Sequence, residues 1–337
     1  MVADRGRILA MLRSGGFVSG AEIGKRLGVS RAMVSREIGV LAAAGCRIEA
    51  VTGRGYRLLA LPDGPLPDVM AALWHGRFDY PVRFLPELPS TMQLAGEWAR
   101  AGAPAGATVV TDHQTAGRGR RGRNWQDPPG EALLMSIVLR PRLEAGAAGW
   151  LPLAVAVGAA RAVREVTGGA PGIKWPNDLL HEGRKLAGIL VELTLDEQDV
   201  RYAVAGLGVN VHQTAFPAEI AGRATSLRQA LGYRGTRAEL MATLVPGVLG
   251  AVEELELDPP RLRDAWRAQS VTLGREVEIR TSQGGVRGLA LDVDEIGRIV
   301  LETPDGRRQA YAAGEISLDQ DAAGPSGSTG RSSSSSM

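Results

Sequence analysis

The stretch Gln114-Thr115-Ala116-Gly117-Arg118-Gly119-Arg120-Arg121-Gly122-Arg123-Asn124-Trp125 decides how the rest of this sequence is interpreted. It contains four arginines and three glycines, and their order fits neither a packed helix nor a half-buried strand. Such a loop can bring backbone N–H groups and guanidinium groups close to phosphate or carboxylate oxygens. Gly-Arg runs also occur in disordered RNA-binding segments, so this stretch alone leaves two interpretations open.

Length and composition predict a globular protein of two or three domains. The chain has 337 residues, and hydrophobic residues make up 44% of it. A single cysteine, Cys46, excludes an intramolecular disulfide and agrees with a reducing cytoplasm; we expect it to be a small packing residue. Residues 1–16 lack the apolar core of a signal peptide, and the most apolar window, 151–160, is too short to span a bilayer. The sequence therefore predicts a soluble, cytoplasmic protein without a membrane partner.

The charge is unevenly distributed along the chain. Residues 1–62 carry ten Lys and Arg against four Asp and Glu, a net charge of +6, so the remainder carries −4. A basic N-terminal region on a mildly acidic body predicts contact with nucleic acid at that region only.

The N-terminal region, 1–62, is predicted to be a winged helix-turn-helix domain. A helix is expected over 4–14, a second from Ser19 to Gly28, and a third that Ser30 caps. Residues 47–51 and 56–59 flank a Gly-containing turn and predict a hairpin, the wing. The residues off the buried stripe of the third helix and at the tip of the wing are the DNA-contact candidates. They are Ser30, Arg31, Ser35, Arg36 and Arg54. A basic domain used only for dimerisation or for regulating its neighbour is the alternative.

The rest of the chain divides into four parts. Three prolines and a glycine in 61–67 predict a stiff linker, which we place at 63–80. Residues 81–270 alternate apolar β-branched runs with helical segments and predict an α+β or α/β domain around a buried sheet. Short alternating runs broken by turns predict a small β-barrel over 271–320. The Gly/Ser-rich end, 321–337, is predicted to be disordered.

Three further motifs carry chemistry: Lys174-Trp175-Pro176-Asn177-Asp178, the run from Lys185 to Glu192, and Gly206-Leu207-Gly208-Val209-Asn210-Val211. Strand alternation predicts that Lys185, Ala187 and Ile189 share a face, which suits a buried carboxylate beside a slender ligand. Gly206-x-Gly208 lacks the third glycine of a dinucleotide-binding fingerprint. With four histidines and one cysteine, the chain shows no metal-ligand spacing, and we expect no structural metal site.

These four motifs, in this order, resemble those of the biotin protein ligases. Together with the N-terminal domain, the chain is similar to the bifunctional bacterial form, which is also the repressor of the biotin operon. The resemblance covers residues 4–318. It implies an α+β fold with a winged helix-turn-helix, a central mixed-sheet domain like that of class II synthetases, and an SH3-like C-terminal domain. It also implies biotin and Mg-ATP as ligands, a biotin carboxyl carrier protein and operator DNA as partners, and a ligand-dependent homodimer.

The resemblance further assigns roles to individual residues. Biotin would contact Ser90, Thr91, Met92, Gln114, Gly117, Arg118, Gly119, Arg120, Lys185 and Gly188. ATP and the adenylate would contact Arg118, Arg120, Arg121, Arg123, Trp125, Lys174, Asn177 and Asn210. Catalysis would involve Lys185, Arg120 and Asp178, with Asp178 either accepting a proton from the acceptor lysine or holding Mg²⁺. Trp125 fits either a lid over adenine or a core anchor.

Two positions depart from the family pattern, and several functions remain open. Met92 stands where Asn commonly follows Ser-Thr, and Asp319 follows Ile316-Ser317-Leu318 where the family often has a basic residue. The leading hypothesis is a biotin–[biotin carboxyl carrier protein] ligase that also acts as a repressor. The alternatives are a ligase whose winged helix does not read DNA, a non-catalytic biotin-sensing repressor, and a lipoate or octanoate ligase.

Overall fold

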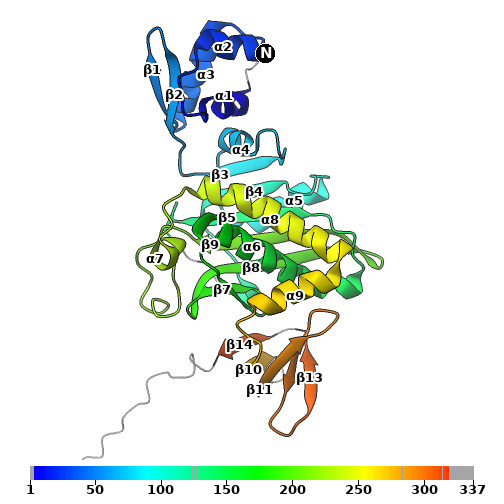
Figure 1. The fold of residues 1–337 in the computed structure, drawn as a ribbon. Coiled ribbons are helices and arrows are strands. Elements are labelled where there is room, and N and C mark those ends of the chain that lie inside the picture. Colours follow the sequence, from blue (N-terminus) through cyan, green and yellow to red (C-terminus); the bar gives the residue numbers. More distant parts are fainter. Residues whose placement is uncertain (1–3, 123–124, 126–127, 282–283, 313, 319–337) are drawn as a thin grey trace, which may run out of the picture.

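The computed structural model describes residues 4–122, 125, 128–281, 284–312 and 314–318. They form an N-terminal head, a central body and a C-terminal β domain (Figure 1). This confirms the predicted α+β class with a helix-turn-helix at one end and an antiparallel β domain at the other. The tail 321–337 and Asp319 lie outside the described residues.

The head is a three-helix domain with a β-hairpin wing, as predicted. Ser19 and Ser30 cap the second and third helices by accepting hydrogen bonds from Glu22 N and Met33 N. Cys46 is buried, and burial raises the pKa of its thiol to about 11, as expected for a packing residue. The elements are α1 (Arg5–Leu12), α2 (Gly20–Leu27), α3 (Arg31–Ala43), β1 (Arg47–Val51) and β2 (Gly55–Ala60).

The segment after the head is not the stiff linker that the prolines predicted over 63–80, because it contains helix α4 (Pro67–Trp74). Pro67 occupies the first turn, where its missing N–H is not needed. Trp74 is buried and donates from Nε1 to Ala242 O in the body at 2.9 Å. Asp68 pairs with Arg5 of the head at 2.9 Å. Tertiary packing of an apolar face therefore makes this segment a connector that contacts both units.

The body is built on a seven-stranded mixed sheet in the order β3-β4-β5-β9-β8-β7-β6. Only β3 and β4 are parallel, and the other neighbours are antiparallel. The strands are β3 (Val82–Leu88), β4 (Thr108–Gln114), β5 (Ala132–Leu139), β6 (Gly172–Lys174), β7 (Asp178–His181), β8 (Arg184–Asp196) and β9 (Asp199–Asn210).

Helices cover the two faces of this sheet unequally. On one face α6 (Leu151–Thr167) and α8 (Arg237–Leu257) pack side by side, with α9 (Pro259–Gln269) beyond them (Figure 1). On the other face α5 (Thr91–Arg100) covers only part of the strands. The short helix α7 (Leu227–Leu231) follows a long loop after β9.

Helix α6 with the preceding turn, 145–167, is longer than the apolar window seen in the sequence. It is long and apolar enough to span a membrane by composition, but 72% of its apolar window is buried inside the protein. We therefore interpret it as the central core helix of the body, where burial on all sides removes the need for a polar face.

The C-terminal domain is a five-stranded antiparallel sheet in the order β13-β12-β11-β10-β14. It is fixed to the body by Trp150, whose Nε1 donates to Asp294 O at 2.9 Å, and by Thr272, whose Oγ1 accepts from Trp175 N at 2.9 Å. Its strands are β10 (Glu276–Thr281), β11 (Gly284–Val293), β12 (Ile299–Glu302), β13 (Arg308–Tyr311) and β14 (Glu315–Leu318).

Candidate functional site: a glycine-floored pocket

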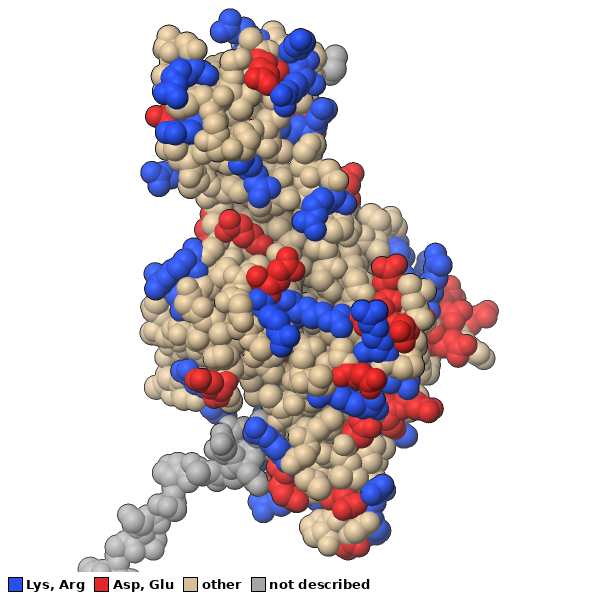
Figure 2. Space-filling model, in the orientation of Figure 1, with Lys and Arg blue, Asp and Glu red and all other residues tan. Residues whose placement is uncertain are grey.

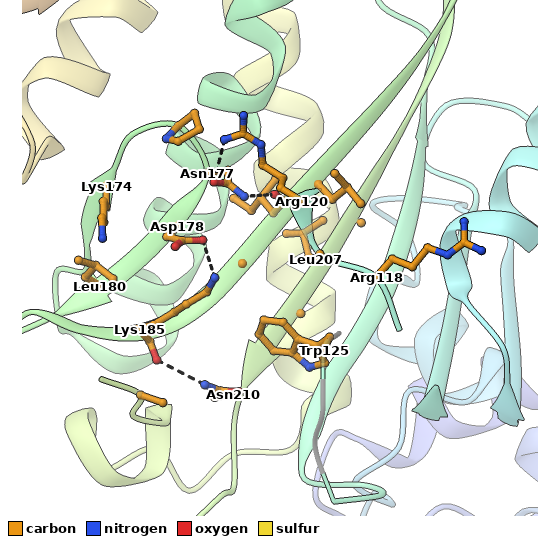
Figure 3. Close-up of a pocket in the computed structure, with 18 of the residues that line it drawn as sticks. Arg118, Arg120, Trp125, Lys174, Asn177, Asp178, Leu180, Lys185, Leu207 and Asn210 are labelled. Atoms are coloured by element: carbon orange, nitrogen blue, oxygen red, sulfur yellow. Dashed lines mark hydrogen bonds and ion pairs between the residues drawn. The ribbon is translucent and has the colours of Figure 1, made fainter. Parts of the chain in front are cut away.

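A cavity of about 700 Å³ opens on the face of the sheet that α5 leaves uncovered (Figure 3). Its floor contains three glycines, because Gly188 pairs with Gly208 across β8 and β9, and Gly206 lies two residues away. A Cβ on Gly208 would lie 2.8 Å from the Trp125 ring, and one on Gly206 would lie 2.6 Å from Met92 Sδ. The absence of these side chains therefore creates the space in which a ligand can lie against the strands.

The predicted face of Lys185 was wrong. Leu179 and Leu180 of β7 pair with Ala187 and Lys185 of β8, so Leu186 between them has no partner on β7 and forms a β-bulge. This bulge breaks the alternation. Lys185 Nζ lies 3.1 Å from the position of a Cβ on Gly188, whereas Ala187 and Ile189 are buried in the helix-side core. Lys185 thus shares its face with Gly188. The small residue beside Lys185 on this face is Gly188, whereas alternation predicted Ala187.

One end of the pocket is cationic. Lys185 Nζ forms an ion pair with Asp178 Oδ1 at 2.7 Å (Figure 3). Arg120 Nη1 donates to Asn177 Oδ1 at 3.4 Å, and Asn177 Nδ2 donates to Ile189 O at 2.6 Å. The Lys174–Asp178 motif therefore meets both the start of β8 and the arginine loop, and Lys174 also lines the cavity. Lys185 and Arg120 carry two positive charges at this wall, and Asp178 carries one negative charge. The wall therefore keeps a net positive charge, which suits an anionic ligand.

The other end is a chain of uncharged hydrogen-bonding groups. Gln114 Oε1 accepts from Thr91 N at 2.8 Å and from Thr91 Oγ1 at 3.2 Å, and Ser136 Oγ donates to Thr91 Oγ1 at 2.7 Å. Ser90 occupies the N-cap position of α5, but its side chain makes no capping hydrogen bond. Its hydroxyl lies at the pocket wall instead. Met92 adds an apolar surface beside these groups.

Trp125 lies inside the cavity. Its ring centroid is 5.8 Å from Lys185 Nζ, and its backbone N donates to Gly117 O at 3.1 Å. Its indole Nε1 is buried without a hydrogen-bond partner. The side chain is half-buried and absent from the fully buried core.

Asn210 lines the pocket, but its amide is used within the protein. Nδ2 donates to Thr225 O at 3.0 Å and to Lys185 O at 3.4 Å, and Oδ1 accepts from Gln213 Nε2 at 3.3 Å. These bonds hold the loop after β9 against the start of β8 (Figure 3). Because these bonds occupy its side-chain amide, Asn210 has little hydrogen-bonding capacity left for the nucleotide contact that was expected of it.

The structure brings together most of the predicted site residues. Those lining the cavity are Ser90, Thr91, Met92, Gln114, Arg118, Gly119, Arg120, Trp125, Lys174, Asn177, Asp178, Lys185, Gly188 and Asn210. Gly117 adjoins it, since a Cβ there would lie 3.1 Å from Gln114 Nε2. The Arg118 side chain extends away from Lys185 and Asp178 (Figure 3). The backbone of Arg121 lies in the turn Arg120–Gly122, and Arg123 lies outside the described residues.

Sequence reasoning missed several contributors to the pocket. Ser136 is an ordinary-looking polar residue within an apolar strand, and Gly206 and Gly208 were noted only as an incomplete dinucleotide motif. Glycines at alternate positions of a strand next to a functional motif would have been a usable signal. Arg280 and Ile316 reach the pocket from the C-terminal domain, and Arg223 from the loop after β9. No local pattern marks these three, because tertiary packing brings them there.

The predicted DNA contacts lie on the surface of the head. Ser30, Arg31, Ser35, Arg36 and Arg54 are all exposed, and basic side chains are spread over the visible surface of the head (Figure 2). Arg54 stacks over the Phe17 ring, 4.1 Å from its centroid, so the tip of the wing is held in place. Arg36 pairs with Glu37 at 2.9 Å, and Arg5 and Arg36 lower the pKa of that carboxyl.

Comparison with known proteins places this fold and pocket in one class. Residues 84–210 match the Biotin/lipoate A/B protein ligase family, residues 5–57 match an HTH domain, and residues 272–319 match the Biotin protein ligase C terminal domain. The solved structure of a biotin protein ligase from Aquifex aeolicus in complex with biotin and ATP superposes with a TM-score of 0.61 at 28% identity. That match covers 71% of this chain and 98% of the other.

Two curated relatives span nearly the whole chain. The bifunctional ligase/repressor BirA of Bacillus subtilis is 36% identical over 308 residues, 88% of this chain and 93% of the relative. The Escherichia coli protein of the same name is 33% identical over 316 residues, 93% of this chain and 96% of the relative. The chain therefore belongs to the family of biotin protein ligases, in the form that also carries an N-terminal HTH domain.

Proposed function

We propose that this protein is an ATP-dependent biotin–[biotin carboxyl carrier protein] ligase, and that it represses the biotin operon as an adenylate-bound dimer. The observation that carries the ligase function is the single cavity that joins Lys185 and Arg120 at one end to the Thr91–Gln114–Ser136 chain at the other, over a glycine floor. Such a cavity fits a slender ligand with a carboxylate at one end and an uncharged polar head group at the other.

Biotin is such a ligand. Its ureido group would lie at Thr91 and Gln114, where amide and hydroxyl groups both donate and accept hydrogen bonds. Its aliphatic chain would pass Met92 and the glycines, and its carboxylate would reach Lys185. The peptide groups of Gly117–Arg120 would close over it. Arg118, Arg121 and Arg123 are proposed to face the nucleotide when the ligands are bound.

The reaction follows from this orientation. A biotin carboxylate oxygen attacks the α-phosphorus of ATP, the bond from that phosphorus to the bridging oxygen breaks, and pyrophosphate leaves. Lys185 and Arg120 counter the charge that develops on the phosphoryl oxygens, and such fixed donors are worth about 3 kcal/mol each. The acceptor lysine amine then attacks the acyl carbonyl and AMP leaves. Asp178 is proposed to accept the amine proton. Trp125 and Asn210 would flank the nucleotide, with Lys174 and Asn177 at its phosphates.

Magnesium would arrive with ATP. Asp178 is the one carboxylate among the described residues that line the cavity, and the described residues contain no cluster of three His, Cys, Asp or Glu side chains. This donor set fits Mg²⁺ held by phosphates and water, with Asp178 as its protein ligand only in the alternative in which Asp178 does not take the amine proton. The ion would neutralise phosphate charge, while the binding and orientation of biotin fall to the protein groups above.

The second proposed function, repression of the biotin operon, would use the exposed basic surface of the head. Ser30, Arg31, Ser35, Arg36 and Arg54 would contact operator DNA, with the third helix in the major groove and the wing on the backbone. Operator sites of dimeric proteins are two-fold repeats, so the adenylate-bound homodimer would present two heads. Because the carrier protein, ATP and operator DNA occur together in the bacterial cytoplasm, we place the protein there.

Biotin-dependent ATP–pyrophosphate exchange tests the ligase function. Wild-type protein should incorporate labelled pyrophosphate into ATP only when biotin is present. Lys185→Ala should reduce the rate of this exchange by roughly 100-fold or more. Lys25→Ala, on the exposed face of the head, is the matched control and should exchange like wild type. Exchange supported by octanoate instead of biotin would assign the pocket to a lipoate-type ligase. No exchange with either acid would leave a sensor without catalysis.

A further inference from the structure

Lys185 lies beyond the end of its pairing with β9, and a loop takes the place of that strand beside it. The pairing of β8 with β9 reaches only to Ala187. Lys185 N instead donates to Arg223 O at 2.7 Å, and Lys185 O accepts from Thr225 N at 2.9 Å, which forms a parallel bridge. The backbone of Lys185 is therefore held in place by residues 223–225 of the loop after β9.

Asn210 connects this loop to the start of β8. Its Nδ2 donates to Thr225 O at 3.0 Å and to Lys185 O at 3.4 Å (Figure 3). Because a carbonyl oxygen can only accept, the NH₂ group of the amide must lie on this side and Oδ1 must point away. Oδ1 accepts from Gln213 Nε2 at 3.3 Å. The donor from Gln213 therefore fixes the orientation in which Asn210 holds the two carbonyls.

The side chain of Gln213 is buried but does not border the ligand cavity. It is 2% exposed, whereas Asn210 beside it lines the cavity. Burying an amide costs free energy unless its polar atoms are hydrogen-bonded. Gln213 Oε1 nevertheless has no hydrogen-bond partner among the described residues. The bond that Gln213 donates to Asn210 is therefore the contact that accounts for a buried amide at this position.

Other hydrogen bonds already hold the shape of this loop. Ser226 Oγ donates to Gln213 O at 2.7 Å and accepts from Gln229 N at 3.1 Å. Gln229 Nε2 donates to Thr214 O at 2.6 Å. The side-chain amide of Gln213 takes no part in these bonds. Within the part of the chain that the structure describes, this amide makes one hydrogen bond, and that bond goes to Asn210.

We infer that Gln213 is a positioning residue for Lys185 and that it acts through Asn210. It keeps the NH₂ group of Asn210 on the carbonyls of Lys185 and Thr225, and so fixes the backbone from which Lys185 Nζ reaches the cationic end of the pocket. A displacement of about 1 Å in a site can cost roughly 100-fold in rate, so a small movement of this backbone weakens the contact with the reacting groups. The inference rests on the proposed function for the reaction that Lys185 serves.

A double-mutant cycle on biotin-dependent pyrophosphate exchange tests this role. Gln213→Met keeps the size of the side chain but removes the donor, and kcat should fall by roughly tenfold. Gln213→Glu puts an acceptor against Asn210 Oδ1 and should lower kcat further. In the Lys185→Ala background, Gln213→Met should have less than about a twofold effect, because the group that it positions is gone. Gln229→Met, in the same loop, is the matched control and should stay within about twofold in both backgrounds.

Hydrogen exchange of the full chain without ligands measures the same positioning independently of catalysis. The amides of Lys185 and Thr225, which donate in the bridge, should exchange roughly fivefold or more faster in Gln213→Met than in wild type. They should be unchanged in Gln229→Met, and urea unfolding should show that both variants are folded.

Unchanged protection of these amides in Gln213→Met would overturn the inference. An equal loss of kcat with and without Lys185 would also overturn it, because a packing defect alone would act in that way. Absence of biotin-dependent exchange in wild type would instead refute the proposed function, and the amide exchange would still decide whether Gln213 positions Lys185.

Discussion

The two faces of the seven-stranded sheet are formed by the same strands, but one face builds the core and the other borders the ligand cavity. On the helix side, Ala205, Leu207 and Val209 of β9 pack under α6 and α8 in the main core. On the other side, Gly206 and Gly208, which alternate with them, leave a cavity. Because neighbouring residues of a strand point to opposite faces, one strand both stabilises the domain and creates the ligand site. Stability and ligand binding should therefore separate at adjacent positions.

Gly208→Val is the strongest test of this separation. The new side chain would enter the space of the Trp125 ring, which lies 2.8 Å from the position of a Cβ. We expect biotin-dependent pyrophosphate exchange to fall by roughly 100-fold, since a misplacement of about 1 Å in a site can cost that much. The midpoint of urea unfolding should change less than in a core variant, because the overlap is with the half-buried Trp125 ring at the cavity and not with the packed helix-side core. Wild-type activity in Gly208→Val would show that the glycine floor is not needed for ligands.

Val209→Ala makes the opposite change one residue away. Val209 is 1% exposed and belongs to the helix-side core, so the variant should lose roughly 2 kcal/mol of unfolding free energy through lost burial and an unfilled cavity. Its kcat and KM for biotin should stay within about twofold of wild type at 25 °C. Urea unfolding and steady-state kinetics on the same preparation measure both quantities. A large rise in KM without loss of stability would contradict the division between the faces.

The sequence was sufficient for elements with local signals. Ser19, Gly28 and Ser30 set the ends of the head helices through capping and a left-handed C-cap, both of which depend on neighbouring residues only. The pocket motifs were found because their residue types and order are specific. In contrast, the face of Lys185 depends on a bulge against β7, and α4 depends on packing against α1 of the head and α8 of the body. Both are set by partners distant in sequence, which periodicity and composition do not encode.

The helix side also depends on a close approach between α6 and α8. A Cβ on Gly158 would lie 2.5 Å from Gly247 O and 2.7 Å from Val248 Cα. Gly158→Ala should therefore force the helices apart and cost about 1–2 kcal/mol, despite the better helix propensity of alanine. Gly250→Ala, on α8 with open space around it, is the control and should be neutral or slightly stabilising. Equal thermal midpoints for the two variants would show that this contact is not tight.

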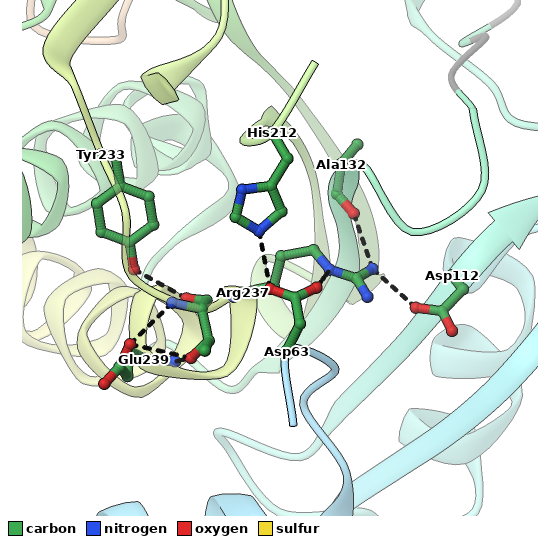
Figure 4. A network of polar contacts seen from close by, with 8 residues as sticks. Asp63, Asp112, Ala132, His212, Tyr233, Arg237 and Glu239 are labelled. Carbon is green, nitrogen blue, oxygen red and sulfur yellow. Dashed lines mark hydrogen bonds and ion pairs between the residues drawn. The ribbon is translucent and has the colours of Figure 1, made fainter. Parts of the chain in front are cut away.

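Arg237, the buried first residue of α8, pairs with Asp63 and Asp112 (Figure 4), and this network should give the smallest effect on stability. Burial disfavours ionisation of Asp63, but hydrogen bonds from His212 and Arg237 outweigh it and lower the pKa of this carboxyl to about 2. A lowered folded-state pKa stabilises the protein above the unfolded pKa near 4, and that contribution is lost as the pH falls from about 4 through 2.

Because the Asp63 side chain is 37% exposed, solvent screening reduces this contribution to about 1 kcal/mol. The difference in unfolding free energy between wild type and Asp63→Asn, measured by urea titration, should therefore shrink as the pH is lowered from 4.5 to 2.5. A difference that stays constant across this range would mean that the carboxylate is not stabilised by its partners. The segment between head and body would then be held by the packing of α4 and not by the ion pair of Asp63.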